Sequence, residues 1–136
     1  SFARLIGLEE GLDAETLFTL ESAALVHDIG IRICEEKYGG NTGKQQEAEG
    51  PAPAREMLEQ LGYPPQVTDR VCFLVGHHHT YSGIEGADYQ ILVEADFLVN
   101  LYEDGLGRAE AESVLNRIFK TPSGRKLLKT MFLTPA

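Results

Sequence analysis

The stretch AALVHDIG, residues 23–30, is the most informative part of this chain. A run of small and aliphatic residues leads directly into His27 and Asp28, and the chain then turns at Gly30. An ionised carboxylate beside apolar residues costs free energy unless a cation or several donors pair with it. An adjacent imidazole and carboxylate can both reach one cation, and zinc, iron, manganese and nickel accept such ligands. The dipeptide alone leaves a second interpretation open, in which His27 interacts with the negative end of a helix and Asp28 caps the next turn.

The hydrophobic pattern on both sides of this stretch predicts an all-α fold. Asp13 is expected to cap a helix whose inward face carries Phe18 and Leu25 and extends to Asp28. The segment Gly39–Gly50 is rich in glycine and polar residues and is predicted to be a loop. Further helices are expected at residues 31–38, 51–62, 63–79, 87–105, 108–120 and 123–132. Together they predict a compact helical bundle, with residues 1–136 forming a single domain.

Composition excludes several classes of protein. The formal net charge of −9 repels nucleic acid and anionic membranes, so neither is an expected partner. No apolar run approaches the roughly 20 residues needed to cross a bilayer, and the first residues do not resemble a signal peptide, so a cytoplasmic location is expected. Cys34 and Cys72 are too few to form a disulfide framework, and both are predicted to be reduced, packed thiols.

A second acidic position lies in the segment LVEADFLVN, residues 92–100. The helical spacing is expected to place Asp96 on the same face as the aliphatic residues, more so than Glu94. A buried carboxylate must find a cation, several hydrogen-bond donors or a raised pKa. The sequence therefore leaves two interpretations of Asp96 open: a metal ligand, or a carboxylate paired with a buried arginine or with backbone amides.

Three histidines follow one another in GHHHT, residues 76–80. Successive helical side chains point roughly 100° apart, so not all three can serve one site. His78 and His79 are expected to face it, whereas His77 is expected to lie nearer the core. The alternative is that all three are helix-terminal histidines favoured by the dipole.

The nearby segment GGNTGKQ, residues 39–45, does not have the spacing of a phosphate-binding P-loop. Lys44 could still contact a substrate phosphate from this loop, although a solvated lysine is the simpler interpretation.

Taken in order, AALVHDIG, EGPAPAREMLEQLG, VCFLVGHHHT and ILVEADFLVN resemble the HD-domain superfamily of metal-dependent phosphohydrolases over about residues 2–102. The resemblance implies a divalent metal ion (Mn, Fe, Zn, Ni, Co or Mg) held by His27, Asp28 and Asp96. It also implies catalytic roles for Asp28, His78 and His79, with Lys44 contacting a small phosphorylated substrate.

The sequence departs from the superfamily pattern at several positions, and two of these departures concern metal-binding histidines. A further metal-binding histidine is expected a few residues upstream of Ser1, so the chain is expected to be a fragment lacking part of its first helix; a degenerate site is the alternative. Gln46 stands where two-metal members have a histidine.

The resemblance therefore predicts a metal-dependent phosphohydrolase acting on a nucleotide or another small phosphate ester. Two alternatives stay open: a non-catalytic HD-like module that binds a nucleotide or a partner protein, and a structural helical domain with ion-paired carboxylates. The sequence specifies neither the substrate nor the oligomeric state.

Overall fold

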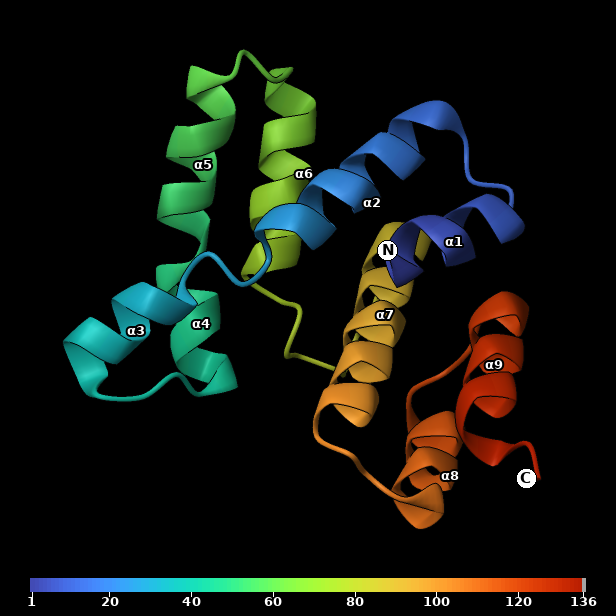
Figure 1. Cartoon of the computed structure of the whole chain (residues 1–136). Coiled ribbons are helices and arrows are strands. Elements are labelled where there is room, and N and C mark those ends of the chain that lie inside the picture. Colours follow the sequence, from blue (N-terminus) through green and yellow to red (C-terminus); the bar gives the residue numbers. More distant parts are fainter. Residues whose placement is uncertain (136) are drawn as a thin grey trace. The chain divides into compact units, whose positions relative to one another are not determined.

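The computed structural model describes residues 1–135, and within them the regular secondary structure is helical (Figure 1). The all-α prediction is confirmed. The α-helices are α1 (Phe2–Glu9), α2 (Ala14–Val26), α3 (Ile31–Tyr38), α4 (Gly43–Glu49), α5 (Pro51–Gln60), α6 (Pro65–Val75), α7 (Ala87–Glu103), α8 (Arg108–Arg117) and α9 (Pro122–Leu128). A π-helical segment, Lys129–Leu133, continues α9.

The chain divides into two compact units. The first unit combines Ser1–Leu17 with the described residues from Ile84 onward, and the second unit is Phe18–Gly83. The first unit thus contains α1, α7, α8 and α9, and the second contains α3 to α6 with most of α2.

In the second unit, α5 and α6 lie side by side (Figure 1). Both helices begin with proline in the first turn, where the missing amide hydrogen costs no hydrogen bond. Gly62 takes a left-handed conformation with φ of 76° directly after α5, which ends the helix as expected. The predicted inward stripe of α6 is confirmed, since its four positions are buried: Val67, Val71, Leu74 and Val75.

The turn after α2 packs very closely against the junction of α4 and α5. A Cβ atom added at Gly30 would lie 3.0 Å from the Cα and N atoms of Gly50, so the backbone at Gly50 would have to shift by a few tenths of an ångström. A Cβ atom added at Gly50 would lie 2.7 Å from Cγ1 of Val75, at the end of α6. Glycine at both positions therefore lets the segments that carry His27 and His78 come together.

A polar clamp joins α3 to α4. The hydroxyl of Tyr38 and the ammonium of Lys37 both donate to Oε2 of Glu49, at 2.6 and 3.2 Å. The hydrogen bond from Tyr38, followed by that from Lys37, lowers the pKa of the Glu49 carboxyl below its usual value. The clamp therefore keeps Glu49 ionised and orients α4 relative to α3.

The first unit is organised around a buried carboxylate on α7. The Glu94 side chain is fully buried and accepts hydrogen bonds from the Gln90 amide, the backbone amides of Lys120 and Thr121, and the Thr121 hydroxyl. A Cβ atom at Gly124 would overlap Oε1 of Glu94, so only glycine fits there. Because Thr121 is the N-cap of α9, Glu94 fixes where this helix begins against α7.

Several expectations about local structure are wrong. Residues 43–49 form α4 rather than a loop, because the side chain of Thr42 caps Gln45 and that of Gln45 caps Thr42, which starts a helix despite the glycine content. The buried face of α2 carries Thr19, Leu20, Ser22 and Ala23, whereas Phe18 and Leu25 are 45% and 83% exposed.

The ends of the chain's last helices also differ from the prediction. α8 ends at Arg117 rather than at residue 120, because the turn at Lys120 and Thr121 is held by Glu94.

Among the described residues, no helix has the length and the apolar character that crossing a membrane requires.

The close approach at Gly30 generates a stability prediction. Gly30→Ala should lower the free energy of unfolding by about 1–3 kcal/mol, because its methyl group would lie too close to the backbone at Gly50. Gly40→Ala is the matched control: an added Cβ there meets no atom within 4 Å, and its φ is not positive. Urea unfolding of both variants measures the difference, and equal stability would show that the contact at Gly30 does not constrain the fold.

Candidate metal centre

The HD dipeptide lies in the turn that follows α2. The helix ends at Val26, so His27 and Asp28 are not on the continuing helical face expected from the sequence. Nδ1 of His27 donates to the carbonyl oxygen of Ala24 at 2.8 Å. This hydrogen bond orients the ring so that Nε2 lies 3.3 Å from Oδ2 of Asp28.

This geometry calls for a positive charge. With Nδ1 donating to a carbonyl, neutral His27 carries its lone pair on Nε2, and that lone pair faces a carboxylate oxygen. Two acceptor atoms at this distance repel each other unless a proton or a cation lies with them. Metal-binding histidines usually bind the ion through one ring nitrogen while the other donates to a carbonyl or carboxylate oxygen, as Nδ1 of His27 does here. His27 and Asp28 thus have the donor chemistry that a divalent transition metal prefers.

The triple histidine is divided between three environments. α6 ends at Val75, so the 100° spacing no longer applies to residues 77–79. His78, rather than His77, is the fully buried residue, and its Nδ1 donates to the Val75 carbonyl at 2.7 Å. The expectation that His77 lies inward is therefore wrong: its ring stacks on Phe73, with centroids 4.0 Å apart.

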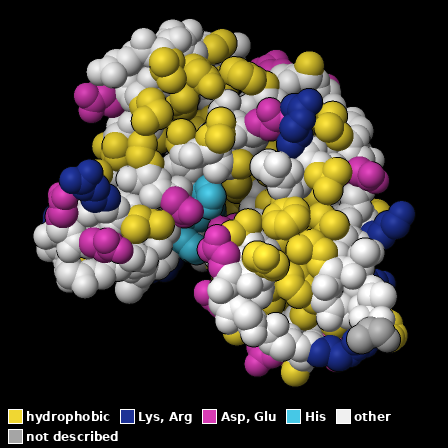
Figure 2. All heavy atoms as spheres, viewed as in Figure 1, with side chains coloured by type: hydrophobic (Ala, Val, Ile, Leu, Met, Phe, Trp, Pro, Cys, Tyr) yellow, Lys and Arg dark blue, Asp and Glu magenta, His cyan; other side chains and the backbone are white. Residues whose placement is uncertain are grey.

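The structure brings His78 and His79 together with His27. The rings of His27 and His78 meet edge to face with centroids 5.3 Å apart, and those of His78 and His79 lie 4.1 Å apart. All four histidines of the chain belong to the second unit, and histidine side chains reach the surface on the face drawn in Figure 2.

Gln46 and Glu47 are site residues whose roles the sequence did not reveal. The Gln46 amide nitrogen donates to the backbone and side-chain oxygens of Asn41, which turns Oε1 of Gln46 toward His79. Nε2 of His79 therefore donates to this oxygen, at 3.0 Å. Glu47 accepts from the backbone amide of His79 and from the hydroxyl of Thr80. A capping-box signal at Thr42 and Gln45 could have shown that Gln46 and Glu47 lie on one helix.

Lys44 and Asp96 are the two remaining residues that the sequence assigned to the site. Lys44 is on α4 rather than on a loop, is exposed, and lies 3.9 Å from Oε1 of Glu47. Asp96 is on α7 in the first unit and is partly exposed, whereas Glu94 is fully buried, so the expected order of burial of these two acids is wrong. That Asp96 shares an ion with His27 and Asp28 stays a prediction.

The described residues do not contain a complete metal site. Among residues 1–135, no group of three or more His, Cys, Asp or Glu side chains is arranged to hold a metal ion. Cys34 and Cys72 are free and buried, as predicted, and burial raises the pKa of each thiol. Within the described residues, the His27–Asp28 pair is thus two groups of the kind that ligate metals rather than a complete site.

Comparison with known families identifies the class of this protein. The family model of the HD domain matches residues 1–120, and the chain belongs to the HD domain family. No curated protein and no solved structure was found to match the chain.

The hydrogen bonds of the histidines predict their neutral tautomers. His78 should carry its proton on Nδ1 and His79 on Nε2, because each of these nitrogens donates to a carbonyl oxygen. Proton–nitrogen correlation spectra of the imidazole rings distinguish the two forms. Gln46→Leu should remove the preference of His79 and leave that of His78 unchanged; the same tautomer on both residues in the unsubstituted protein would contradict the assigned network.

Proposed function

We propose that this protein is a metal-dependent phosphohydrolase acting on a nucleotide or another small phosphate ester. The observation that carries the proposal is the His27–Asp28 pair, whose Nε2 and Oδ2 atoms lie 3.3 Å apart in a chain of the HD domain family. Such a pair is stabilised by a shared cation, and family membership associates that cation with phosphate chemistry.

His27, Asp28 and Asp96 would hold the metal ion. When bound, the ion would lower the pKa of a coordinated water and polarise a phosphoryl oxygen. Hydrolysis forms a bond between the water oxygen and phosphorus and breaks the ester bond, and the leaving oxygen takes up a proton. Asp28 is more than half exposed, so it can accept a proton from a water that enters from solvent.

The neighbouring side chains would position these groups and meet the substrate. The buried ring of His78 packs against His27 and would keep its imidazole in one orientation. His79 is held by Gln46 and Glu47, so its role would be to shape the site, and only its imidazolium form would have a second N–H to present to negative charge. Lys44 is exposed and could turn from Glu47 toward a phosphate.

A non-catalytic module that binds a nucleotide or a partner protein is the second candidate. The observation that favours it is the Gln46–His79 hydrogen bond, which occupies Nε2 of His79 where a second metal would need a ligand. Such a module would bind its ligand without releasing phosphate.

The decisive experiment measures metal content and phosphate release with the same preparations. After incubation with Mn²⁺, Asp28→Ala and Asp96→Ala should each lose bound metal and lower hydrolysis of nucleotide monophosphates and model phosphate esters by about a hundredfold or more, because a removed ligand costs more than a change in the surrounding shell. Asp104→Ala is the matched control, since Asp104 is an exposed acid directly after α7.

Three outcomes separate the candidates. Metal binding with phosphate release, both lost in the two variants, supports the hydrolase. Ligand binding without phosphate release supports the module. Metal content and activity that Asp96→Ala leaves unchanged would exclude Asp96 as a ligand and contradict the proposal.

A further inference from the structure

The charge of this chain is strongly segregated along the sequence. The 24 residues after Glu112 contain five of the 12 basic residues and none of the 21 acidic residues, so their formal charge is +5. The first 112 residues contain the other seven basic residues and all 21 acidic residues, a formal charge of −14. A basic segment in so acidic a chain is a candidate binding site for an anion.

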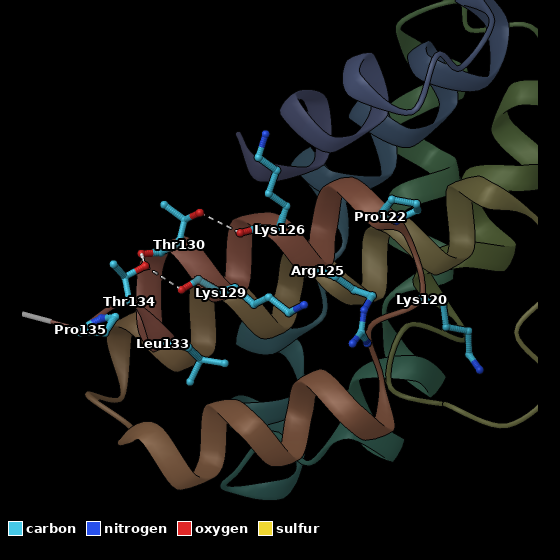
Figure 3. A pocket seen from close by; sticks show the side chains of 9 residues that line it. All are labelled: Lys120, Pro122, Arg125, Lys126, Lys129, Thr130, Leu133, Thr134 and Pro135. Carbon is cyan, nitrogen blue, oxygen red and sulfur yellow. Dashed lines mark hydrogen bonds between the residues drawn. The ribbon is translucent and has the colours of Figure 1, made fainter.

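The basic residues surround a pocket in the first unit. The pocket has a volume of about 790 Å³, which is within the usual range for small-molecule sites, and it lies along α9 and the π-helical segment that follows (Figure 3). Lys120, Arg125 and Lys129 line it, together with the apolar side chains of Leu133 and Pro135. It therefore offers both cationic groups and an apolar wall.

Arg125 is held in place before any ligand arrives. Its Nη1 donates to the carbonyl oxygens of Leu115 and Phe119, at 3.0 and 3.1 Å. These bonds orient the planar guanidinium but do not neutralise its charge, because carbonyl oxygens are uncharged. A guanidinium with one edge bound in this way is preorganised to donate to an oxyanion with the rest of its fork.

The lysines differ in direction. In Figure 3 the side chain of Lys129 extends toward Arg125, whereas that of Lys126 extends to the opposite side of the helix. Lys126 also borders a separate pocket of about 140 Å³ next to Leu5 and Ile6 of α1. Within the described part of the chain, no carboxylate forms an ion pair with Lys120, Lys126 or Lys129. The pocket thus contains a cluster of cations that have no acidic partner among residues 1–135, and Lys126 is also part of its lining.

We propose that this pocket binds a small phosphorylated anion, with the phosphate between Arg125, Lys120 and Lys129. A phosphate group carries close to two negative charges and three acceptor oxygens. As a ligand for three cations it is therefore better suited than a carboxylate, which has one charge and two oxygens. The hydroxyls of Thr130 and Thr134 lie on the same pocket wall, and Leu133 can contact the organic part of the ligand. Apart from Lys120, this lining lies beyond residues 1–120, so the site is separate from the part matched by the HD family.

The test uses inorganic pyrophosphate as the probe, the whole chain, and a buffer of constant ionic strength. EDTA is present throughout, so that phosphate held by a metal ion elsewhere in the chain does not contribute. In an NMR titration with pyrophosphate, the backbone amide signals of Lys129, Thr130 and Leu133 should shift until they reach a plateau. The shifts should fit a single binding site with a Kd of about 1 mM or lower. Shifts that do not saturate, or that spread evenly over the basic residues, would overturn the proposal.

Two matched variants distinguish binding at this pocket from nonspecific attraction of the anion to positive charge. The double variant Lys120→Gln/Lys129→Gln removes two exposed charges that line the pocket and should weaken pyrophosphate binding about tenfold. The double variant Arg32→Gln/Arg117→Gln removes two exposed charges that do not line the pocket and should weaken binding less than about twofold. Circular dichroism checks that the variants are folded. Equal weakening by both would show that only net charge matters and would contradict the proposal.

A second experiment distinguishes a soluble phosphorylated ligand from a lipid headgroup. It measures co-sedimentation of the protein with vesicles of phosphatidylcholine that contain a phosphoinositide. Binding to pyrophosphate without co-sedimentation supports a soluble phosphorylated ligand. Co-sedimentation that the double variant abolishes supports a lipid headgroup, which has the same phosphate chemistry. Binding only to an acidic peptide or an oligonucleotide, with none to pyrophosphate, would overturn the proposal.

Discussion

The close contact between the backbones at Gly30 and Gly50 is the constraint on which the candidate metal centre depends. An added Cβ at Gly30 would lie 3.0 Å from two backbone atoms of Gly50, and one at Gly50 would meet Val75. His27 lies three residues before Gly30, and His78 lies three residues after Val75. The contact therefore joins the ends of α2 and α6, and the edge-to-face packing of the two imidazoles follows from it.

The two acids of α7 illustrate how a buried carboxylate can be stabilised without a metal. Glu94 is fully buried and has four hydrogen-bond donors, three of which come from Lys120 and Thr121. Its charge is thus offset by the start of a helix and by hydroxyl and amide groups. Asp96 is about 200° away on the helix surface and is partly exposed, so a ligand role for Asp96 does not compete with the structural role of Glu94.

Around the HD dipeptide, each histidine has a distinct environment set by one polar partner. Carbonyl oxygens accept from Nδ1 of His27, His77 and His78, whereas Gln46 accepts from Nε2 of His79. The nitrogen that remains basic therefore differs between adjacent residues. The chain belongs to the HD domain family, and the hydrogen bonds explain why His78 and His79 are not equivalent.

The sequence by itself determined the helical class, the proline starts of α5 and α6, the glycine end of α5 and the resemblance to the HD domain family. These features are local, because capping, proline geometry and periodicity act over a few residues. Only the tertiary structure decided which of Glu94 and Asp96 is buried, which histidine lies inward, and which face of α2 is covered. Periodicity assigns residues to faces of a helix but does not say which face meets a neighbour. Because α7 is apolar nearly all round, its pattern does not single out a buried face. Because α6 ends at Val75, helical periodicity does not apply to the three histidines that follow.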